Sequence, residues 1–249
     1  SPIGVLVSML LPTLFNEQQL KDLINQLENA CEVCNVDILG GHTEVTRAVK
    51  MPIITVTAVG TVKKTEQLHS SKVEAGMDII ATKWVGLEGT AILAKEHETE
   101  LRIRYARPFI DKAKVFSQMM SILPEAAIAR KSGACAMHDV SEGGIFGALW
   151  ELAESAGVGL EIDLKKIPIR QETIEICEYF DLNPYKILSG GSLLIATEDG
   201  NGLVMELEKA NIPAVVIGKA TDSNDRVLLS EDERRFLETT QTDELYHIK

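Results

Sequence analysis

Two kinds of apolar pattern alternate along this chain, and the alternation constrains the fold more than any single motif does. Short runs rich in apolar and β-branched residues, such as 3–11 and 53–62, are typical of strands. Apolar residues also recur at helical spacing through 20–34, after Asn16 and Gln19 in the positions of a capping box. We therefore expect an α+β chain built from two layers.

A polar stretch at 63–76 separates two apolar regions and predicts a domain boundary. We place an N-terminal domain at 1–68 and a C-terminal domain at 69–249. In the second domain the patterns predict strands at 77–82, about 134–137, 159–163, 192–197 and 214–221, and helices after 90, at 108–130, 144–157, 171–180 and 200–212, with a final hairpin and a polar tail.

Charge and composition exclude several classes of protein. The formal net charge of −12 argues against nonspecific binding to nucleic acid or to an anionic membrane. No apolar run reaches the roughly 18–20 residues that a membrane-spanning helix needs. Four cysteines are too few for a disulfide scaffold, so we expect a cytoplasmic, reduced protein. Cys31 and Cys34 lie in the apolar stripe of the first helix, where core packing is favoured over redox or metal chemistry.

Four segments combine glycine with hydroxyl, carboxylate or basic groups. They are "GGHTE" at 40–44, "TKWVGLEGT" at 82–90, "HDVSEGG" at 138–144 and "SGGS" at 189–192. Glycine lets backbone N–H groups approach an anion, and a helix N-terminus favours phosphate. In the first segment we expect strand 36–39 to end in a Gly-Gly turn.

Each of these segments also has a simpler interpretation. Asp139 or Ser141 can merely cap a helix, and "GGHTE" can be a turn with an accidental histidine. "GLEGT" and "SGGS" are weak signals on their own. Four such loops in one chain nevertheless favour a phosphate-binding site, at which Asp139 or Glu142 could hold Mg²⁺.

The order and spacing of four longer stretches resemble a known superfamily. "GGHTEVT", "TKWVGLEGTAILA", "HDVSEGGIFGALWELAESAGVGLEIDL" and "ILSGGSLLIAT" are similar to the aminoimidazole ribonucleotide (AIR) synthase, or PurM-like, superfamily. The likeness covers essentially the whole chain and is strongest to its HypE-like, AIR synthase-related branch. It implies a PurM-like two-domain fold, in which N-terminal strands join a dimeric β-barrel and an α/β layered domain follows.

The resemblance also implies an activity. Members use ATP and Mg²⁺, and several phosphorylate an amide- or carbonyl-type oxygen of an acceptor. We therefore expect a homodimeric, ATP-dependent enzyme whose acceptor is a small molecule or is carried on a protein. A non-catalytic dimeric module that retains the fold and a small-molecule kinase remain the alternatives.

Matching the family's motifs assigns roles to individual positions. Glu44 and Asp139 match catalytic and metal-binding acids, whereas Glu88 is a weaker match. An aspartate stands in the HypE and kinase branches where His42 stands here, and the selenophosphate branch has histidine. The residues expected to contact nucleotide or phosphate are Gly40, Gly41, His42, Thr43, Lys83, Ser141, Gly143, Gly144, Ser189, Gly190, Gly191 and Ser192.

Two departures from the family pattern accompany these expectations. Relatives carry several tens of residues before the position of Ser1, including acidic metal ligands, so we expect this chain to lack part of its nucleotide site. HypE acts through a C-terminal cysteine, whereas this chain ends Tyr246-His247-Ile248-Lys249. A HypE-type self-modification is therefore not assumed.

Overall fold

The chain divides into two units between Gln67 and Leu68. The computed structural model describes residues 2–231, 233–239 and 242–248. Each unit has its own apolar core, and each is described by itself below. None of the helices in the described part of the chain has both the length and the apolar composition needed to cross a bilayer.

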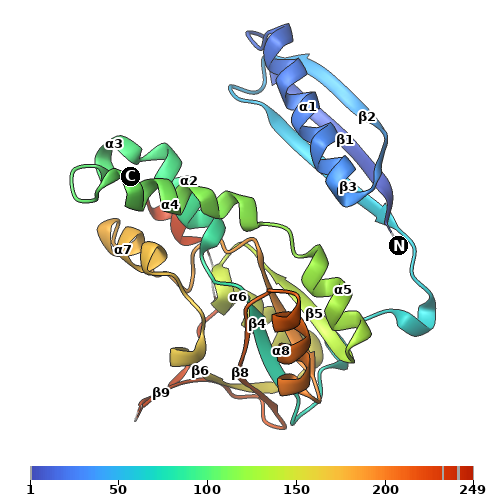
Figure 1. Ribbon diagram of the computed structural model, residues 1–249, viewed down its shortest axis with the longest axis vertical. Coiled ribbons are helices and arrows are strands. Elements are labelled where there is room, and N and C mark those ends of the chain that lie inside the picture. The colour runs from blue at the N-terminus through green and yellow to red at the C-terminus, as the bar shows by residue number, and fades with distance from the viewer. Residues whose placement is uncertain (1, 232, 240–241, 249) are drawn as a thin grey trace. The chain divides into compact units, whose positions relative to one another are not determined.

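The N-terminal unit is a three-stranded sheet with one helix along one face (Figure 1). Its elements are β1 (Pro2–Pro12), α1 (Glu17–Cys34), β2 (Asp37–Thr46) and β3 (Ile53–Gly60). The strand order is β2-β1-β3, with β1 parallel to β2 and antiparallel to β3. Alternate residues of β1 face α1 and are buried, and they form a core with Cys31: Val5, Val7, Met9 and Leu11.

The capping box predicted for α1 is present. The Asn16 side chain accepts a hydrogen bond from the Gln19 N–H at 2.9 Å, and the Gln19 side chain accepts one from the Asn16 N–H at 2.9 Å. The helix ends at Cys34 and is capped by Asn35, whose φ of 51° is left-handed, as is common where a helix stops.

The expected Gly-Gly turn after strand 36–39 is wrong, because β2 continues through both glycines to Thr46. The register between β1 and β2 shifts by one residue between Val5, paired with Ile38, and Leu6, paired with Gly40, which is a β-bulge in β2. A Cβ on Gly41 would lie 1.7 Å from the Val7 carbonyl oxygen, so this glycine permits close approach of β1 and β2. "GGHTE" is therefore part of a strand and not a turn, and its contacts with a phosphate stay a prediction.

The C-terminal unit contains a seven-stranded sheet of order β10-β9-β6-β8-β4-β7-β5. Its strands are β4 (Asp78–Thr82), β5 (Ala134–Val140), β6 (Gly159–Asp163), β7 (Ser192–Thr197), β8 (Ala214–Thr221), β9 (Arg226–Ser230) and β10 (Glu233–Phe236). Its helices are α2 (Leu87–Glu96), α3 (Glu98–Leu101), α4 (Arg107–Val115), α5 (Leu123–Lys131), α6 (Gly144–Ala156), α7 (Gln171–Tyr179) and α8 (Gly200–Lys209). Short 3₁₀ turns are η1 (Lys64–Glu66), η2 (Ser70–Lys72), η3 (Phe116–Met119), η4 (Leu164–Lys166) and η5 (Glu244–His247).

Helices cover both faces of this sheet. Ile79 of β4 packs in a cluster with α6, whereas its neighbour Ile80 packs in a second cluster with α5 and α8. This follows from the alternation of side chains along a strand. Figure 1 shows α8 and α6 on opposite sides of β4. A third cluster joins α2, α4 and α7 around Leu93, Ile110 and Ile176.

Two further expectations need correction. The single helix predicted at 108–130 is three pieces, α4, the turn Phe116–Met119 and α5, and Pro124 lies in the first turn of α5, where proline is tolerated. Segments expected as loops are partly regular, because α2 begins at Leu87 and β5 extends to Val140. Glu88 is therefore helical, and Asp139 lies on a strand.

Candidate functional site

Sheet topology gathers several of the predicted segments at one end of the C-terminal sheet. β7 lies between β4 and β5 and is antiparallel to both. The ends of β4 and β5 and the start of β7 therefore meet. The Ser192 hydroxyl donates to the Thr82 carbonyl at 2.8 Å, which ties two of these ends together. We call residues 83–88, 141–144 and 189–191 the loop cluster.

Hydrogen bonds connect the loops of this cluster. The buried Ser189 Oγ accepts from the Gly86 N–H at 2.7 Å and donates to the Ile187 carbonyl at 2.7 Å. The Ser189 N–H donates to the Ser141 carbonyl at 3.2 Å. A backbone hydrogen bond thus joins the loops of Ser141 and Ser189, and the buried Ser189 hydroxyl ties the loop at Gly86 to them.

Two glycines of the cluster have left-handed backbones in crowded places. Gly144 has φ +62°, and a Cβ there would lie 2.5 Å from the Tyr185 carbonyl oxygen. Gly191 has φ +99°, and a Cβ there would lie 2.7 Å from the Met119 carbonyl oxygen. The absence of a side chain therefore permits close packing of loop on loop, whatever ligand the loops bind.

The N-terminus of α6 already holds an anionic oxygen. The Gly143 N–H donates to Oδ2 of Asp243 at 2.8 Å, and Asp243 is only 4% exposed. A helix N-terminus favours negative charge because its first N–H groups are free. The Asp243 carboxylate occupies the position at which the sequence predicts a phosphate.

Asp243 belongs to a C-terminal segment, residues 242–248, that lies against the loop cluster. The Glu244 carboxylate accepts from the Asn183 N–H at 3.2 Å, and the Tyr246 hydroxyl donates to Glu142 at 3.0 Å. Leu245 packs against the α2, α4 and α7 core. Sequence reasoning missed this contribution, because no local pattern in the polar tail points to a partner so far away along the chain.

A second carboxyl group lies beside these loops. Burial raises the pKa of Glu88, and the nearby Asp243 carboxylate raises it further, while a hydrogen bond from the Gly190 backbone opposes the rise. Glu88 and Asp243 therefore place two acidic groups against the two glycine loops. Glu88, a weak candidate from sequence, is thus a central member of the cluster.

Asp139 has a different environment. It lies on β5, an edge strand, two residues before Ser141, and its side chain is exposed. Within the described residues its carboxylate has no hydrogen bond or ion pair. This exposed carboxylate is accessible to a ligand.

Lys83 is engaged inside the unit. Its Nζ lies 2.6 Å from a Glu125 carboxylate oxygen and donates to the carbonyls of Met119 at 2.9 Å and Ser121 at 2.7 Å. Glu125 is 1% exposed, so this is a buried ion pair with further acceptors around the ammonium group. Breaking it would leave a buried charge uncompensated, which is strongly destabilising.

The candidates in "GGHTE" lie in the N-terminal unit and form a separate group. His42 and Glu44 alternate along β2 and are adjacent, with 3.7 Å between Nε2 and Oε2. Their register partners Ser8 and Leu10 alternate with the β1 residues buried under α1, so both point away from that helix. Thr43 lies on the opposite face, paired with Met9.

No preformed metal cage is present: the described residues contain no group of three or more His, Cys, Asp or Glu able to hold a metal ion. This does not conflict with Mg²⁺, which keeps several waters and usually takes one or two carboxylates plus substrate phosphates. The exposed Asp139 carboxylate beside the phosphate-type loop fits that requirement.

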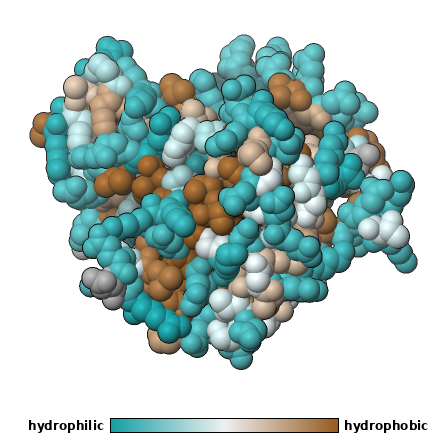
Figure 2. Space-filling model, turned by 60° about the horizontal axis from the view of Figure 1, so that its bottom comes forward, coloured by the Kyte–Doolittle hydropathy of each residue, from teal (hydrophilic) through white to brown (hydrophobic). Residues whose placement is uncertain are grey.

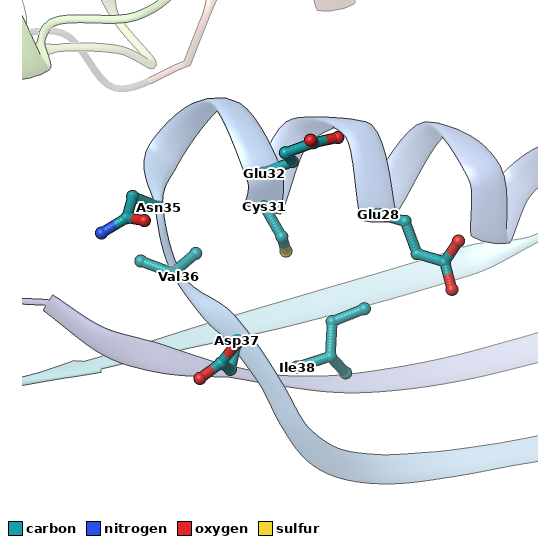
Figure 3. A pocket seen from close by; sticks show the side chains of 7 residues that line it. All are labelled: Glu28, Cys31, Glu32, Asn35, Val36, Asp37 and Ile38. Carbon is teal, nitrogen blue, oxygen red and sulfur yellow. The ribbon is translucent and has the colours of Figure 1, made fainter.

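The N-terminal unit also has a hollow of about 520 Å³ between the end of α1 and the start of β2. Three carboxylates line it, those of Glu28, Glu32 and Asp37. In Figure 3 Glu32 points away from Asp37, and the Cys31 thiol points toward the sheet. Because these groups do not converge on one point, we assign no ligand to this hollow.

Comparison with known proteins identifies the family. Fold and loop cluster together define a PurM-like, two-domain α+β protein. The family described as "AIR synthase related protein, C-terminal domain" matches residues 74–230, and the corresponding N-terminal domain matches residues 1–62. The chain belongs to the AIR synthase-related family.

Individual relatives refine this placement. The chain is 27% identical over 232 residues to "Putative hydrogenase expression/formation protein MJ0676" of Methanocaldococcus jannaschii, covering 92% of this chain and 67% of that protein. It is 25% identical over 207 residues to "Carbamoyl dehydratase HypE" of Cupriavidus necator, covering 82% of this chain and 57% of that protein. The chain thus spans little more than half the length of the latter.

A solved structure supports the fold. "Crystal Structure of Hydrogenase Maturation Protein HypE in complex with ATP" superimposes with a TM-score of 0.78 at 16% identity, covering 98% of this chain and 75% of that one. The prediction of a HypE-like member of the AIR synthase superfamily with a PurM-like two-domain fold is confirmed.

Proposed function

We propose that this protein is an ATP-dependent enzyme that phosphorylates an amide- or carbonyl-type oxygen of an acceptor. The observation that carries the proposal is the carboxylate at the start of α6. An N–H group that binds the Asp243 oxygen in a buried, anion-favouring position can bind a phosphate oxygen by the same physics. Membership of the family supports the nucleotide as the source of that phosphate.

The proposal gives each part of the loop cluster a task. When bound, ATP with Mg²⁺ would supply the phosphoryl group and neutralise the charge that develops during transfer. Gly143 donates its N–H to an anionic oxygen, and Asp139 offers the metal a carboxylate. Glu44 is the candidate acid of the N-terminal unit. Ser189 and Ser192 hold the loops in place, since their hydroxyls are satisfied internally.

Substitution of Asp139 tests the proposal. Asp139→Asn removes the charge that would bind metal, and we expect ATP turnover by the purified protein to fall by at least about a hundredfold, a loss typical of misassembled phosphoryl-transfer sites. The matched control is Glu161→Gln, an exposed carboxylate on β6. Turnover that survives Asp139→Asn unchanged would contradict the proposal.

A second candidate function has its own support. The Asp243 carboxylate fills the anion position, and Lys83 is neutralised by Glu125. Both features suit a non-catalytic module that retains the family fold. This candidate predicts that the purified protein neither binds MgATP in calorimetry nor turns it over. Measured turnover with any acceptor excludes it.

We also propose that the N-terminal sheet pairs with a second copy of the chain. The face opposite α1 includes Leu6 and Ile53, which are 42% and 48% exposed although they lie on paired strands. Burying such residues against an identical sheet removes apolar surface from water, at roughly 25 cal/mol for each Å². A β-barrel shared by two copies would cover this face.

A further inference from the structure

The C-terminal unit contains a second hollow. It measures about 290 Å³ and lies between the first turn of α6, the segment 183–186 and the β9–β10 hairpin. Phe146, Leu228 and Phe236 supply apolar lining, and the polar lining is Asn183, two cationic side chains and one carboxylate, that of Glu238. We call it the basic hollow.

The two cations of the basic hollow are Lys186 and Arg235. Arg235 has no ion pair within the described residues, unlike its neighbour Arg234, which lies 3.8 Å from Asp225. Lys186 meets Glu238 at 3.4 Å, but the Glu238 side chain is 80% exposed, so this contact is worth little. In a chain of net charge −12, this local excess of positive charge favours an anion.

One wall of the basic hollow is aromatic. The rings of Phe146 and Tyr185 stack, with centroids 5.2 Å apart and planes 7° from parallel. The positive charge of Arg235 is close enough to Tyr185 to lower its pKa, against the stronger effect of burial, which raises it. Arg235 and Phe146 both line the hollow, so the cation and the aromatic ring border the same space. Of the two stacked residues Phe146 lines the hollow, so a planar ligand can contact the Phe146 ring while its charged group meets the cations.

The hollow adjoins the α6 N-terminus. Phe146 lies two residues after Gly144, and its N–H donates to the Tyr185 carbonyl at 3.2 Å. On the same segment, the Asn183 backbone binds Glu244 of the C-terminal segment. The basic hollow and the anion position at Gly143 are therefore built on the same two pieces of chain.

We propose that the basic hollow binds a small organic anion, a carboxylate or phosphate attached to a planar unsaturated group. The cations bind the charge, and Phe146 contacts the planar part. At about 290 Å³ the hollow is at the lower end of ligand-pocket sizes, which suits a small molecule. That this anion is the phosphoryl acceptor rests on the proposed function.

Fluorine NMR without nucleotide tests the binding. The probes are 4-fluorobenzoate, 4-fluorophenyl phosphate and the neutral 4-fluorobenzyl alcohol. We expect at least one of the two anions to bind at least about tenfold more tightly than the alcohol. This is the gain in affinity that one charge-assisted hydrogen bond supplies. The preferred anion distinguishes a carboxylate ligand from a phosphate ligand. Equal binding of the alcohol, or no binding of either anion at millimolar concentration, overturns the proposal.

Neighbouring arginines provide matched variants. Arg235→Gln removes the unpaired cation of the hollow and is expected to weaken anion binding about tenfold, whereas Arg234→Gln leaves it within about twofold. Arg235→Lys, which keeps the charge, should restore part of the affinity, and circular dichroism checks that each variant is folded. Equal effects of Arg234→Gln and Arg235→Gln would refute the assignment.

These measurements separate the two proposals. Binding of a probe anion without any ATP turnover contradicts the proposed enzyme but leaves the basic hollow intact. ATP turnover with no anion binding at the hollow contradicts the proposed ligand site but leaves the proposed enzyme intact.

Discussion

Asp243 is the residue that completes the loop cluster. Its buried carboxylate accepts the Gly143 N–H at 2.8 Å and the Leu245 N–H at 3.0 Å. One side chain therefore accepts a hydrogen bond from a backbone N–H at the start of α6 that would otherwise lack a partner. The same side chain fixes the C-terminal segment against the cluster. A contact across about a hundred residues leaves no trace in local sequence patterns.

Replacing Asp243 by alanine tests this role. Asp243→Ala leaves the buried Gly143 N–H without its partner, which costs about 1–3 kcal/mol of unfolding free energy. Urea unfolding measures the loss. The control Asp222→Asn changes an exposed carboxylate and should leave stability nearly unchanged. Equal stability of Asp243→Ala and the parent would show that the contact does not contribute.

Glu88 gives a pH-dependent prediction. Because burial and Asp243 raise its pKa in the folded state, the folded protein binds this proton more tightly than the unfolded chain does. The contribution is stabilising below the ordinary pKa of 4.5 and is lost as the pH rises through the folded value.

Glu88→Gln should therefore be more stable than the parent at neutral pH, by less than about 1 kcal/mol because Glu88 is only partly buried. The difference should shrink as the pH falls below 4.5. Thermal unfolding of both proteins across the acidic range measures it, with Glu161→Gln as the exposed control. A difference that is independent of pH would contradict the assigned cause.

At the scale of elements, the two glycines of β2 offer a matched pair. Gly40 and Gly41 have nearly equal φ values, +149° and +152°. A Cβ on Gly41 would meet the Val7 carbonyl oxygen at 1.7 Å, whereas one on Gly40 would have only Leu6 at 4.0 Å. The pairing of β1 with β2 thus depends on one of them far more than on the other.

We expect Gly41→Ala to cost at least about 2 kcal/mol more than Gly40→Ala, because overpacking against a backbone atom cannot relax by a change of rotamer. Urea unfolding of the two variants gives the comparison. Similar losses for both would mean that strain in the backbone, which the two positions share, outweighs the contact with β1.

Most elements follow from local pattern, and the exceptions have physical causes. Periodicity and the capping box at Asn16 predict α1, because both signals lie within a few residues of the helix. The local pattern does not predict that β2 continues through Gly40 and Gly41. Glycine favours a turn locally, and only pairing with the neighbouring β1 makes this segment a strand. The break between α4 and α5 was also missed, although Pro124 marks it.

The candidate site was predictable only in part. Glycine-rich motifs identified Ser141, Gly143 and Ser189, which the fold brings together. The sequence could not reveal that Glu125 engages Lys83 or that Asp243 fills the anion position, since both depend on tertiary contacts. The roles of these residues toward a nucleotide remain predictions.

For the whole molecule, the uncovered face of the N-terminal sheet makes association testable. Leu6→Lys places a charge among the exposed apolar residues of that face and should convert a dimer to a monomer in analytical ultracentrifugation. Val33→Lys is the matched control, since Val33 is 86% exposed on α1, and it should leave the dimer intact. A parent protein that sediments as a monomer would contradict the proposed pairing.

The central claim is that the start of α6 receives a phosphate of ATP. The most direct measurement follows the backbone N–H resonance of Gly143 by NMR while MgATP is added to the labelled protein. We predict a saturable shift at Gly143 and Gly144, because the N–H now bound to Asp243 changes its acceptor. In the Asp139→Asn variant, far more MgATP should be needed to reach the same shift. Resonances of both glycines that stay unchanged at saturating MgATP would contradict the account.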